Sequence, residues 1–188
     1  MKPAQLFLLI ALLGAPMLAT AETREIQEVP FRIAGGQKVM VKISKNGAVP
    51  AENDKVAITA AAVLISPPGA DGIRSLVWSF GLTAKTRDEI ARITVENVFP
   101  SDPAVVLRTD EAPSLNNGMW IGQLDNGDPN GEQNGWLRAK GLAGFVFKFT
   151  VAYKDGTETV LHQLALFGEN DKEYFRQHAA SVQEPAGS

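Results

Sequence analysis

The sequence predicts an all-β protein, a two-sheet antiparallel β-sandwich of the immunoglobulin-like Greek key type. Apolar residues recur at every second position along most of the chain, which is the period of a half-buried strand. Clusters of Gly, Pro, Asn and Asp separate these runs, as turns do. We expect about eight or nine strands in two stacked sheets, each covering the apolar face of the other. A jelly roll or a small barrel is the alternative.

The first 21 residues have the features of a secretory signal peptide. Lys2 precedes an apolar run over residues 6–13, and Pro16 lies shortly before the small residues Ala19-Thr20-Ala21. A membrane-spanning helix needs about 20 apolar residues, more than this run supplies. We therefore expect cleavage after Ala21, no stable membrane insertion afterwards, and a bacterial protein that is periplasmic or secreted.

The composition of the mature chain limits its chemistry. Residues 22–181 suit one sandwich domain, and residues 182–188 are expected to be a flexible tail. Removal of Lys2 with the leader leaves 17 basic against 21 acidic side chains, a formal charge of −4. This mild acidity argues against nucleic-acid binding, which depends on clustered Lys and Arg. The chain has no cysteine, so disulfides, thiolate nucleophiles and cysteine-ligated metals are excluded.

The N-terminal half is predicted to form strands that alternate between inward and outward residues. Gly35-Gly36 separates the first two, which we expect to pair as a hairpin near a sheet edge, with Val39, Val41 and Ile43 facing inward. The third is almost wholly apolar and ends at Pro67, which favours a central strand over a buried helix. The fourth places Trp78 and Phe80 on one face. The expected strands of this half cover residues 24–33, 37–43, 56–65, 73–80 and 91–99.

The C-terminal half is dominated by one strong hairpin signal. Shorter strands are expected over residues 104–108 and 118–124. Asp155-Gly156 then supplies the positive φ angles of a two-residue type I′ turn, which would pair Lys154 with Thr157. This register puts the following residues on one core face: Phe145, Phe147, Phe149, Val151, Tyr153, Val160, His162, Leu164 and Leu166.

A short C-terminal helix is predicted over residues 170–181. Asn170 is followed three residues later by Glu173, a variant of the helix capping signal, ahead of Tyr174 and Phe175.

The segment between Trp120 and Trp136 is the strongest candidate for a ligand site. It is polar and rich in turn residues, and an aromatic ring with nearby amides and carboxylates is how proteins hold sugars and peptides. The alternative is that both tryptophans are buried and hold a long loop to the sandwich. The candidate ligand-binding residues are Trp120, Asp125, Asn126, Asp128, Asn130, Gln133, Asn134 and Trp136.

Part of this segment resembles a calcium loop. Asn126, Asp128, Asn130 and Gly131 match positions 1, 3, 5 and 6 of an EF-hand-type loop, whose oxygen ligands alternate around the cation. Position 12, normally a bidentate Glu, is Leu137. Calcium is therefore the one cofactor the sequence offers, and turn chemistry alone also explains the Asp, Asn and Gly residues.

Catalytic signatures are weak in this chain. The only histidines are His162 and His178, and His162 is expected in the core beside Phe149. Paired carboxylates could hydrolyse glycosides without histidine if they faced each other across a cleft. The candidates for that role are Asp110, Glu111, Asp125, Asp128 and Glu132.

The function expected from these observations is non-catalytic. We expect the domain to bind an envelope protein or a surface polymer through loops at one end or along an exposed strand edge. The first alternative is a carbohydrate-binding or calcium-dependent module that uses the loop between Trp120 and Trp136. The second is a carboxylate-dependent hydrolase.

Overall fold

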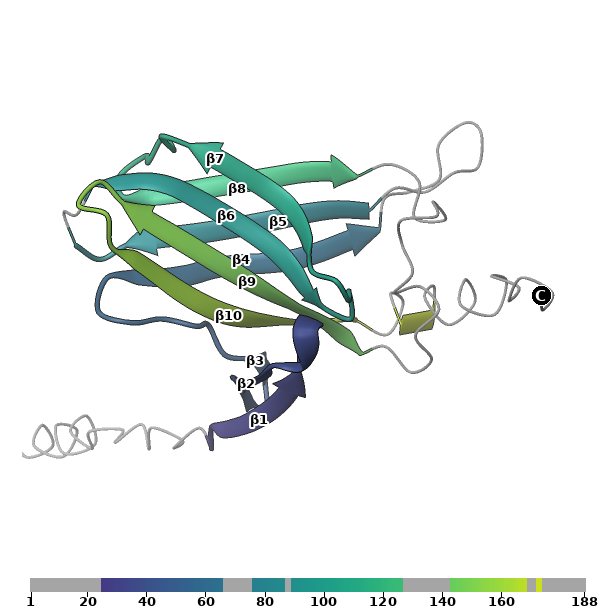
Figure 1. The fold of residues 1–188 in the computed structure, drawn as a ribbon. Helices are drawn as coiled ribbons and strands as arrows, with labels where there is room; N and C mark the ends of the chain where they lie inside the picture. The colour runs from purple at the N-terminus through teal and green to yellow at the C-terminus, as the bar shows by residue number, and fades with distance from the viewer. Residues whose placement is uncertain (1–24, 66–75, 87–88, 127–142, 169–171, 174–188) are drawn as a thin grey trace, which may run out of the picture.

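The chain folds into three antiparallel sheets, two of which stack as a sandwich (Figure 1). The computed structural model describes residues 25–65, 76–86, 89–126, 143–168 and 172–173. The sheets have the strand orders β4-β5-β8, β10-β9-β6-β7 and β1-β2-β3. The strands are β1 (Gln27–Arg32), β2 (Lys38–Ser44), β3 (Gly47–Ala48), β4 (Val56–Ile65), β5 (Leu76–Ala84), β6 (Ile90–Phe99), β7 (Val105–Glu111), β8 (Met119–Asn126), β9 (Gly144–Tyr153) and β10 (Glu158–Leu166).

The main core lies between the sheets β4-β5-β8 and β10-β9-β6-β7, as the alternating pattern predicts. Aromatic residues of β5 and β9 interlock across it. Trp78 meets Phe145 edge-on with ring centroids 5.1 Å apart, and Phe80 meets Phe147 in the same way at 5.2 Å. Such edge-to-face pairs add to the stabilisation that burial of the rings already gives. The predicted all-β sandwich is confirmed.

The strand order places the first, second and fifth sandwich strands in one sheet and the other four in the second. It agrees with a constant-type immunoglobulin domain for every strand except β7, which pairs with β6 and not with β8. The sandwich is therefore established, and the immunoglobulin-like Greek key stays a prediction. Among the described residues, the two stacked sheets share no ladder of main-chain hydrogen bonds, which distinguishes them from a closed barrel.

The N-terminal hairpin forms as predicted but packs in an unexpected place. Gln27–Arg32 pairs with Lys38–Ser44, and Val39 and Val41 are buried. They pack against Val98, Val146 and Leu164, which point outward from the four-stranded sheet. Figure 1 shows the small sheet β1-β2-β3 against the β9-β10 part of that sheet. Part of the outer face of the four-stranded sheet is thus buried under the small sheet.

The β9-β10 hairpin has a different turn from the predicted one. Tyr153, not Lys154, closes the loop, because its N–H donates to the Thr157 carbonyl oxygen at 2.9 Å. Gly156 has φ 84°, whereas Asp155 does not have a positive φ. A type I′ turn needs positive φ at both central residues, and a three-residue loop with one glycine in the left-handed region does not.

This change of turn shifts the register by one residue, so the predicted core face of β10 is wrong. His162 lies opposite Lys148, and not opposite Phe149. A shift of one residue turns every side chain to the other face of the sheet. Val160 and Leu166 are accordingly exposed, at 47% and 49%. The side chains of β10 that face β9's core residues are Thr159, Leu161, Gln163 and Ala165.

Other predicted segments are covered only in part. The strand expected over 104–108 begins at Val105 and continues to Glu111. Of the predicted helix, only Lys172 and Glu173 are described, and both are helical. The leader over residues 1–21 and the tail over residues 182–188 lie outside the described residues.

Candidate binding surfaces

Trp120 is a core residue and not an exposed platform. Its side chain is 2% exposed and joins the sandwich core. The ring lies across Gly122, where an added Cβ would come within 2.6 Å of it. Its Nε1 donates a 2.7 Å hydrogen bond to Oδ2 of Asp110. Of the two predictions for Trp120, an exposed ligand platform or a buried residue, the structure agrees with the buried residue.

Asp110 and Arg108 close the seam where the edges of β7 and β8 meet. Arg108 NH2 lies 2.9 Å from Oδ1 of Asp110, and Arg108 Nε donates to Oδ2 at 3.1 Å. The guanidinium also donates through NH1 to the Gln123 carbonyl oxygen at 2.8 Å. The side chains of β7 thereby cover part of the edge of β8, which protects it from pairing with other chains. Asp110, a candidate hydrolytic carboxylate, is engaged in this contact.

The rest of the predicted ligand segment can be placed only as far as Asn126. Asp125 and Asn126 end β8, opposite Val77 and Leu76. The other candidate residues, Asp128, Asn130, Glu132, Gln133, Asn134 and Trp136, lie outside the described residues. Among the residues that are described, no three His, Asp or Glu side chains form a group that suits a metal ion.

His162 lies on the outer face of the four-stranded sheet, in a row with Glu96 and Lys148. Lys148 Nζ is 2.7 Å from Oε2 of Glu96. Burial, and after it the positive charge of Lys148, lowers the pKa of His162, while Glu96 opposes the shift. Its Nε2 is buried without a hydrogen-bond partner among the described residues. This arrangement favours the neutral imidazole and offers no orienting partner at Nε2 for acid–base chemistry.

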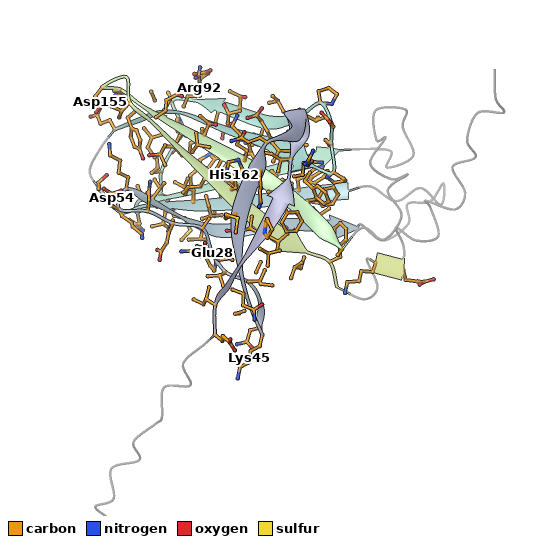
Figure 2. All side chains as sticks on the ribbon, turned by 60° about the horizontal axis from the view of Figure 1, so that its bottom comes forward. Glu28, Lys45, Asp54, Arg92, Asp155 and His162 are labelled. Carbon is orange, nitrogen blue, oxygen red and sulfur yellow. The ribbon has the colours of Figure 1, made fainter. Side chains whose placement is uncertain are left out.

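The end of the sandwich that holds the β9-β10 turn, here called the loop end, carries exposed charges (Figure 2). Figure 2 shows Asp54, Arg92 and Asp155 there, away from His162. A shallow hollow of about 310 Å³ at the loop end is lined partly by Glu89 and Lys154. These two form an exposed ion pair, and the contact with Lys154 lowers the pKa of Glu89. The charges in this hollow thus already neutralise each other.

The second seam of the sandwich, between β4 and β10, contains a groove. Three strands meet there, and each is the edge strand of a different sheet: β3, β4 and β10. The prediction of a central strand for β4 is therefore wrong, because β5 is the strand that lies in the middle of that sheet. Its volume is about 340 Å³. We call it the edge groove. It is lined by Asn46, Gly47, Ala48, Pro50, Ile58, Thr59, Ala60, Ala61, Gln163, Leu164, Ala165 and Leu166.

The edge groove is bordered by main-chain groups of β10. The N–H of Phe167 donates to the Ala143 carbonyl oxygen at 2.9 Å, so the odd-numbered residues of β10 bond toward β9. Because the direction alternates in an antiparallel pair, the main-chain groups of Leu164 and Leu166 point to the other edge. Among the described strands, β10 pairs only with β9. Leu166 is therefore the outward-facing position at the open end of the groove.

Gln163 holds one boundary of the edge groove in place. Its Oε1 accepts a 2.6 Å hydrogen bond from the N–H of Ala51, and its Nε2 donates to the Val49 and Leu164 carbonyl oxygens at 3.4 and 2.8 Å. The segment that crosses from β3 to β4 is thus fixed to β10. Sequence reasoning missed this buried glutamine, because the predicted register put position 163 outside. The available signal was a polar residue directly before the apolar run Leu164-Ala165-Leu166.

The walls of the edge groove are neutral and partly continuous with the core. None of its lining residues is charged. Ile58 and Ala165 belong to the main core cluster, at 2% and 7% exposure. The groove therefore combines small or apolar side chains with strand edges that can still form hydrogen bonds.

Comparisons with known protein families, with characterised proteins and with solved structures find no match to this chain. No helix within the described ranges combines the length and apolar character that crossing a membrane requires. The edge groove and the surfaces of the sandwich are therefore the features that bear on function.

Proposed function

We propose that this protein is an exported, non-catalytic binding module of the bacterial envelope, which holds an extended segment of a partner protein in the edge groove. The observation that carries the proposal is the meeting of three edge strands, β3, β4 and β10, around one neutral groove. Edge strands are templates for pairing with another chain. Native proteins usually cover them, as Arg108 covers part of β8 at the opposite seam.

Strand addition explains how such a groove would recognise a partner. An extended segment beside β10 would bond to the outward-facing main chain at Leu166, and these bonds do not depend on the side chains of the segment. Every second side chain of the segment would turn toward Ile58 and Ala61 at the seam. Because those walls are apolar and uncharged, we expect apolar residues at alternate positions of the segment and no charge at them.

Export rests on the N-terminal leader, residues 1–21, with its charged start and small residues before the expected cleavage site. The bacterial periplasm or the external medium is the proposed location. The carbohydrate, calcium and hydrolase alternatives now depend mainly on residues 128–136, because Trp120 is buried and Asp110 is bound to Arg108.

The test is binding of short random peptides, displayed on phage, to the protein and to Leu166→Pro. Proline removes the outward-facing N–H and is tolerated on an edge whose N–H points away from the sheet. Val160→Pro is the matched control, since it lies on the same strand, in the same orientation and outside the groove. We expect selected peptides with apolar residues at alternate positions, bound by the protein and by Val160→Pro but not by Leu166→Pro.

A second variant, Leu166→Lys, keeps the main chain intact and places a charge on the groove wall. This variant remains informative if Leu166→Pro does not fold. The melting temperature of each variant shows whether it is folded. If no peptide is selected, or if folded Leu166→Pro and Leu166→Lys bind the selected peptides as well as Val160→Pro does, the groove is not the binding site.

A further inference from the structure

His162 lies at the margin of the area that the small sheet β1-β2-β3 covers. The side chains that follow one another on the outer face of β10 are Val160, His162 and Leu164. Val160 is 47% exposed, whereas Leu164 is 4% exposed and packs in one cluster with Val39 and Val41 of β2. His162, between them, is half-buried. The border of the covered area therefore passes through His162.

The charges that act on His162 come from its own row of the four-stranded sheet. Lys148 lies directly opposite on β9, and Glu96 lies beyond Lys148 on β6. These two form the 2.7 Å ion pair. Further along the same face, Arg92 and Glu158 pair with each other at 3.6 Å. The positive charge next to His162 is thus that of Lys148.

The small sheet brings no charge of β1 or β2 toward this row. Its residues that face the sandwich alternate with the charged ones, and the paired residues of β1 and β2 on that side are apolar or uncharged. Figure 2 shows Lys45, in the turn after β2, at the tip of the small sheet and away from His162. The charged residues of the two strands are exposed, and they are Glu28, Arg32, Lys38 and Lys42.

Protonation of His162 conflicts with the docked position of the small sheet. A protonated imidazole has two N–H donors, yet Nε2 is buried and meets no acceptor among the described residues. A buried charged donor without an acceptor costs free energy, and contact with water removes that cost. Burial, followed by Lys148, is what lowers the pKa of His162. Release of the small sheet uncovers this border, so it returns the pKa toward the ordinary value of about 6.5.

The small sheet also forms one wall of the edge groove. Gly47 and Ala48 of β3 line the groove, and Leu164 lines it while also packing in the cluster under the small sheet. Among the described strands, β3 pairs only with β2, so the two move together. Gln163 holds the N–H of Ala51 to β10, so a movement of the small sheet ends before β4. The groove is therefore complete only while the small sheet is docked.

We propose that protonation of His162 releases the small sheet β1-β2-β3 from the outer face of β9 and β10, and thereby removes one wall of the edge groove. A partner segment is then held at neutral pH and released at acid pH. Release of the small sheet follows from the position of His162, whereas release of a partner also rests on the proposed function.

The sign of the pH dependence follows from the lowered pKa of His162. The docked state favours the neutral imidazole, so docking is at full strength above the ordinary histidine pKa of about 6.5. It weakens as the pH falls below that value toward the lower pKa of the docked state. An open state with an ordinary histidine limits the increase in the opening constant to about 30-fold at about pH 5.

Hydrogen exchange measures release of the small sheet without any ligand. An undocked hairpin is marginal in water, so release also frees the amides that join β1 to β2 and the N–H of Val49, which donates to the Lys42 carbonyl oxygen at 2.9 Å. We expect their opening constant, corrected for the intrinsic exchange rate, to rise several-fold from about pH 7.5 to about pH 5. The amides that join β6 to β9 should not share this increase.

Two variants assign the effect to His162. His162→Gln keeps a polar side chain that does not titrate, so its small sheet should open equally at both pH values. His178→Gln is the matched control, because His178 is the only other histidine of the chain, and it should respond as the natural protein does. An opening constant of the natural protein that ignores pH, or an equal rise in His162→Gln, would refute the release.

NMR of His178→Gln adds a measurement that does not depend on the folding of His162→Gln. Its one imidazole signal belongs to His162 and should titrate over the same pH range in which the small sheet opens. Opening that occurs outside the titration range of His162 would also refute the release.

The peptides selected for the edge groove test the connection between the two sites. They should bind the natural protein less tightly at about pH 5 than at about pH 7.5, and bind His162→Gln equally at both. Equal binding to the natural protein at both pH values, while its small sheet opens, would refute the connection. If no peptide is selected but opening still depends on His162, the proposed function fails and the release of the small sheet stands.

Discussion

At the residue scale, the side chains of Arg108, Asp110 and Trp120 illustrate how polar groups support this sandwich. Trp120 brings its indole N–H into the core, where a missing hydrogen bond is costly. The carboxylate of Asp110 accepts that hydrogen bond and also forms an ion pair with Arg108. The pairing joins two sheets that share no main-chain hydrogen bonds in the described part of the chain.

Asp110→Ala should therefore destabilise the protein more than an ordinary surface substitution. Removal of the acceptor leaves the buried indole donor unpaired, which costs about 2 kcal/mol of the free energy of unfolding. Urea denaturation measures this change. Glu111→Ala is the control, since Glu111 is the exposed neighbour on the same strand, and we expect it to stay within about 0.5 kcal/mol of the natural protein. Equal effects of the two substitutions would show that the contact contributes nothing.

At the element scale, the β9-β10 hairpin shows how one turn residue controls a whole strand. Gly156 takes the left-handed conformation, and Asp155 accepts hydrogen bonds from the N–H and the hydroxyl of Thr157, at 2.8 and 2.7 Å. These bonds lower the pKa of Asp155. The three-residue loop brings Gln163 into the seam and leaves Leu166 exposed at the edge groove. The candidate binding site thus depends on the turn.

Gly156→Ala should destabilise the hairpin by about 1 kcal/mol, because an alanine at φ 84° is strained. Gly156→Asn should cost less, since asparagine tolerates the left-handed region. Nothing lies within 4 Å of the Cβ position, so crowding does not contribute to either value. Thermal unfolding of the two variants gives the comparison, and an equal loss in both would contradict this explanation.

At the scale of the whole molecule, the protein has two hydrophobic cores of unequal extent. The main cluster lies inside the sandwich, and the smaller one joins the sheet β1-β2-β3 to the outside of β9 and β10. Phe31 and Phe99 contribute to the smaller cluster, with ring centroids 5.2 Å apart. Because fewer buried residues hold the small sheet, it should open without unfolding the sandwich.

Native-state hydrogen exchange tests this difference. We expect the amides that join β1 to β2 to exchange with a lower free energy of opening than the amides that join β6 to β9. The β6-β9 amides should exchange only through global unfolding, as their dependence on denaturant would report. A single value for all of these amides would mean that the molecule unfolds as one unit.

Local sequence patterns were sufficient for the fold class, the inward-facing residues of β5 and β9, and the pairing of the N-terminal hairpin. These features depend on alternation and turn residues, which are properties of neighbouring positions. The small sheet was predicted correctly as a hairpin but not in its place, because Val39 and Val41 look the same whether they face a sandwich core or the outside of another sheet. The candidate ligand site was not predicted equally well. Trp120 is a core tryptophan, and residues 128–136 lie outside the described structure.

The sequence by itself determined that this chain is an all-β sandwich, because apolar faces that repeat every two residues must be covered, and a chain with few helical segments covers them with other sheets. Only the tertiary structure decided which strand edges remain open. The edge groove requires β3, β4 and β10 to meet, although β10 is far from the other two strands in the chain. That juxtaposition arises from contacts between distant segments, which local patterns do not encode.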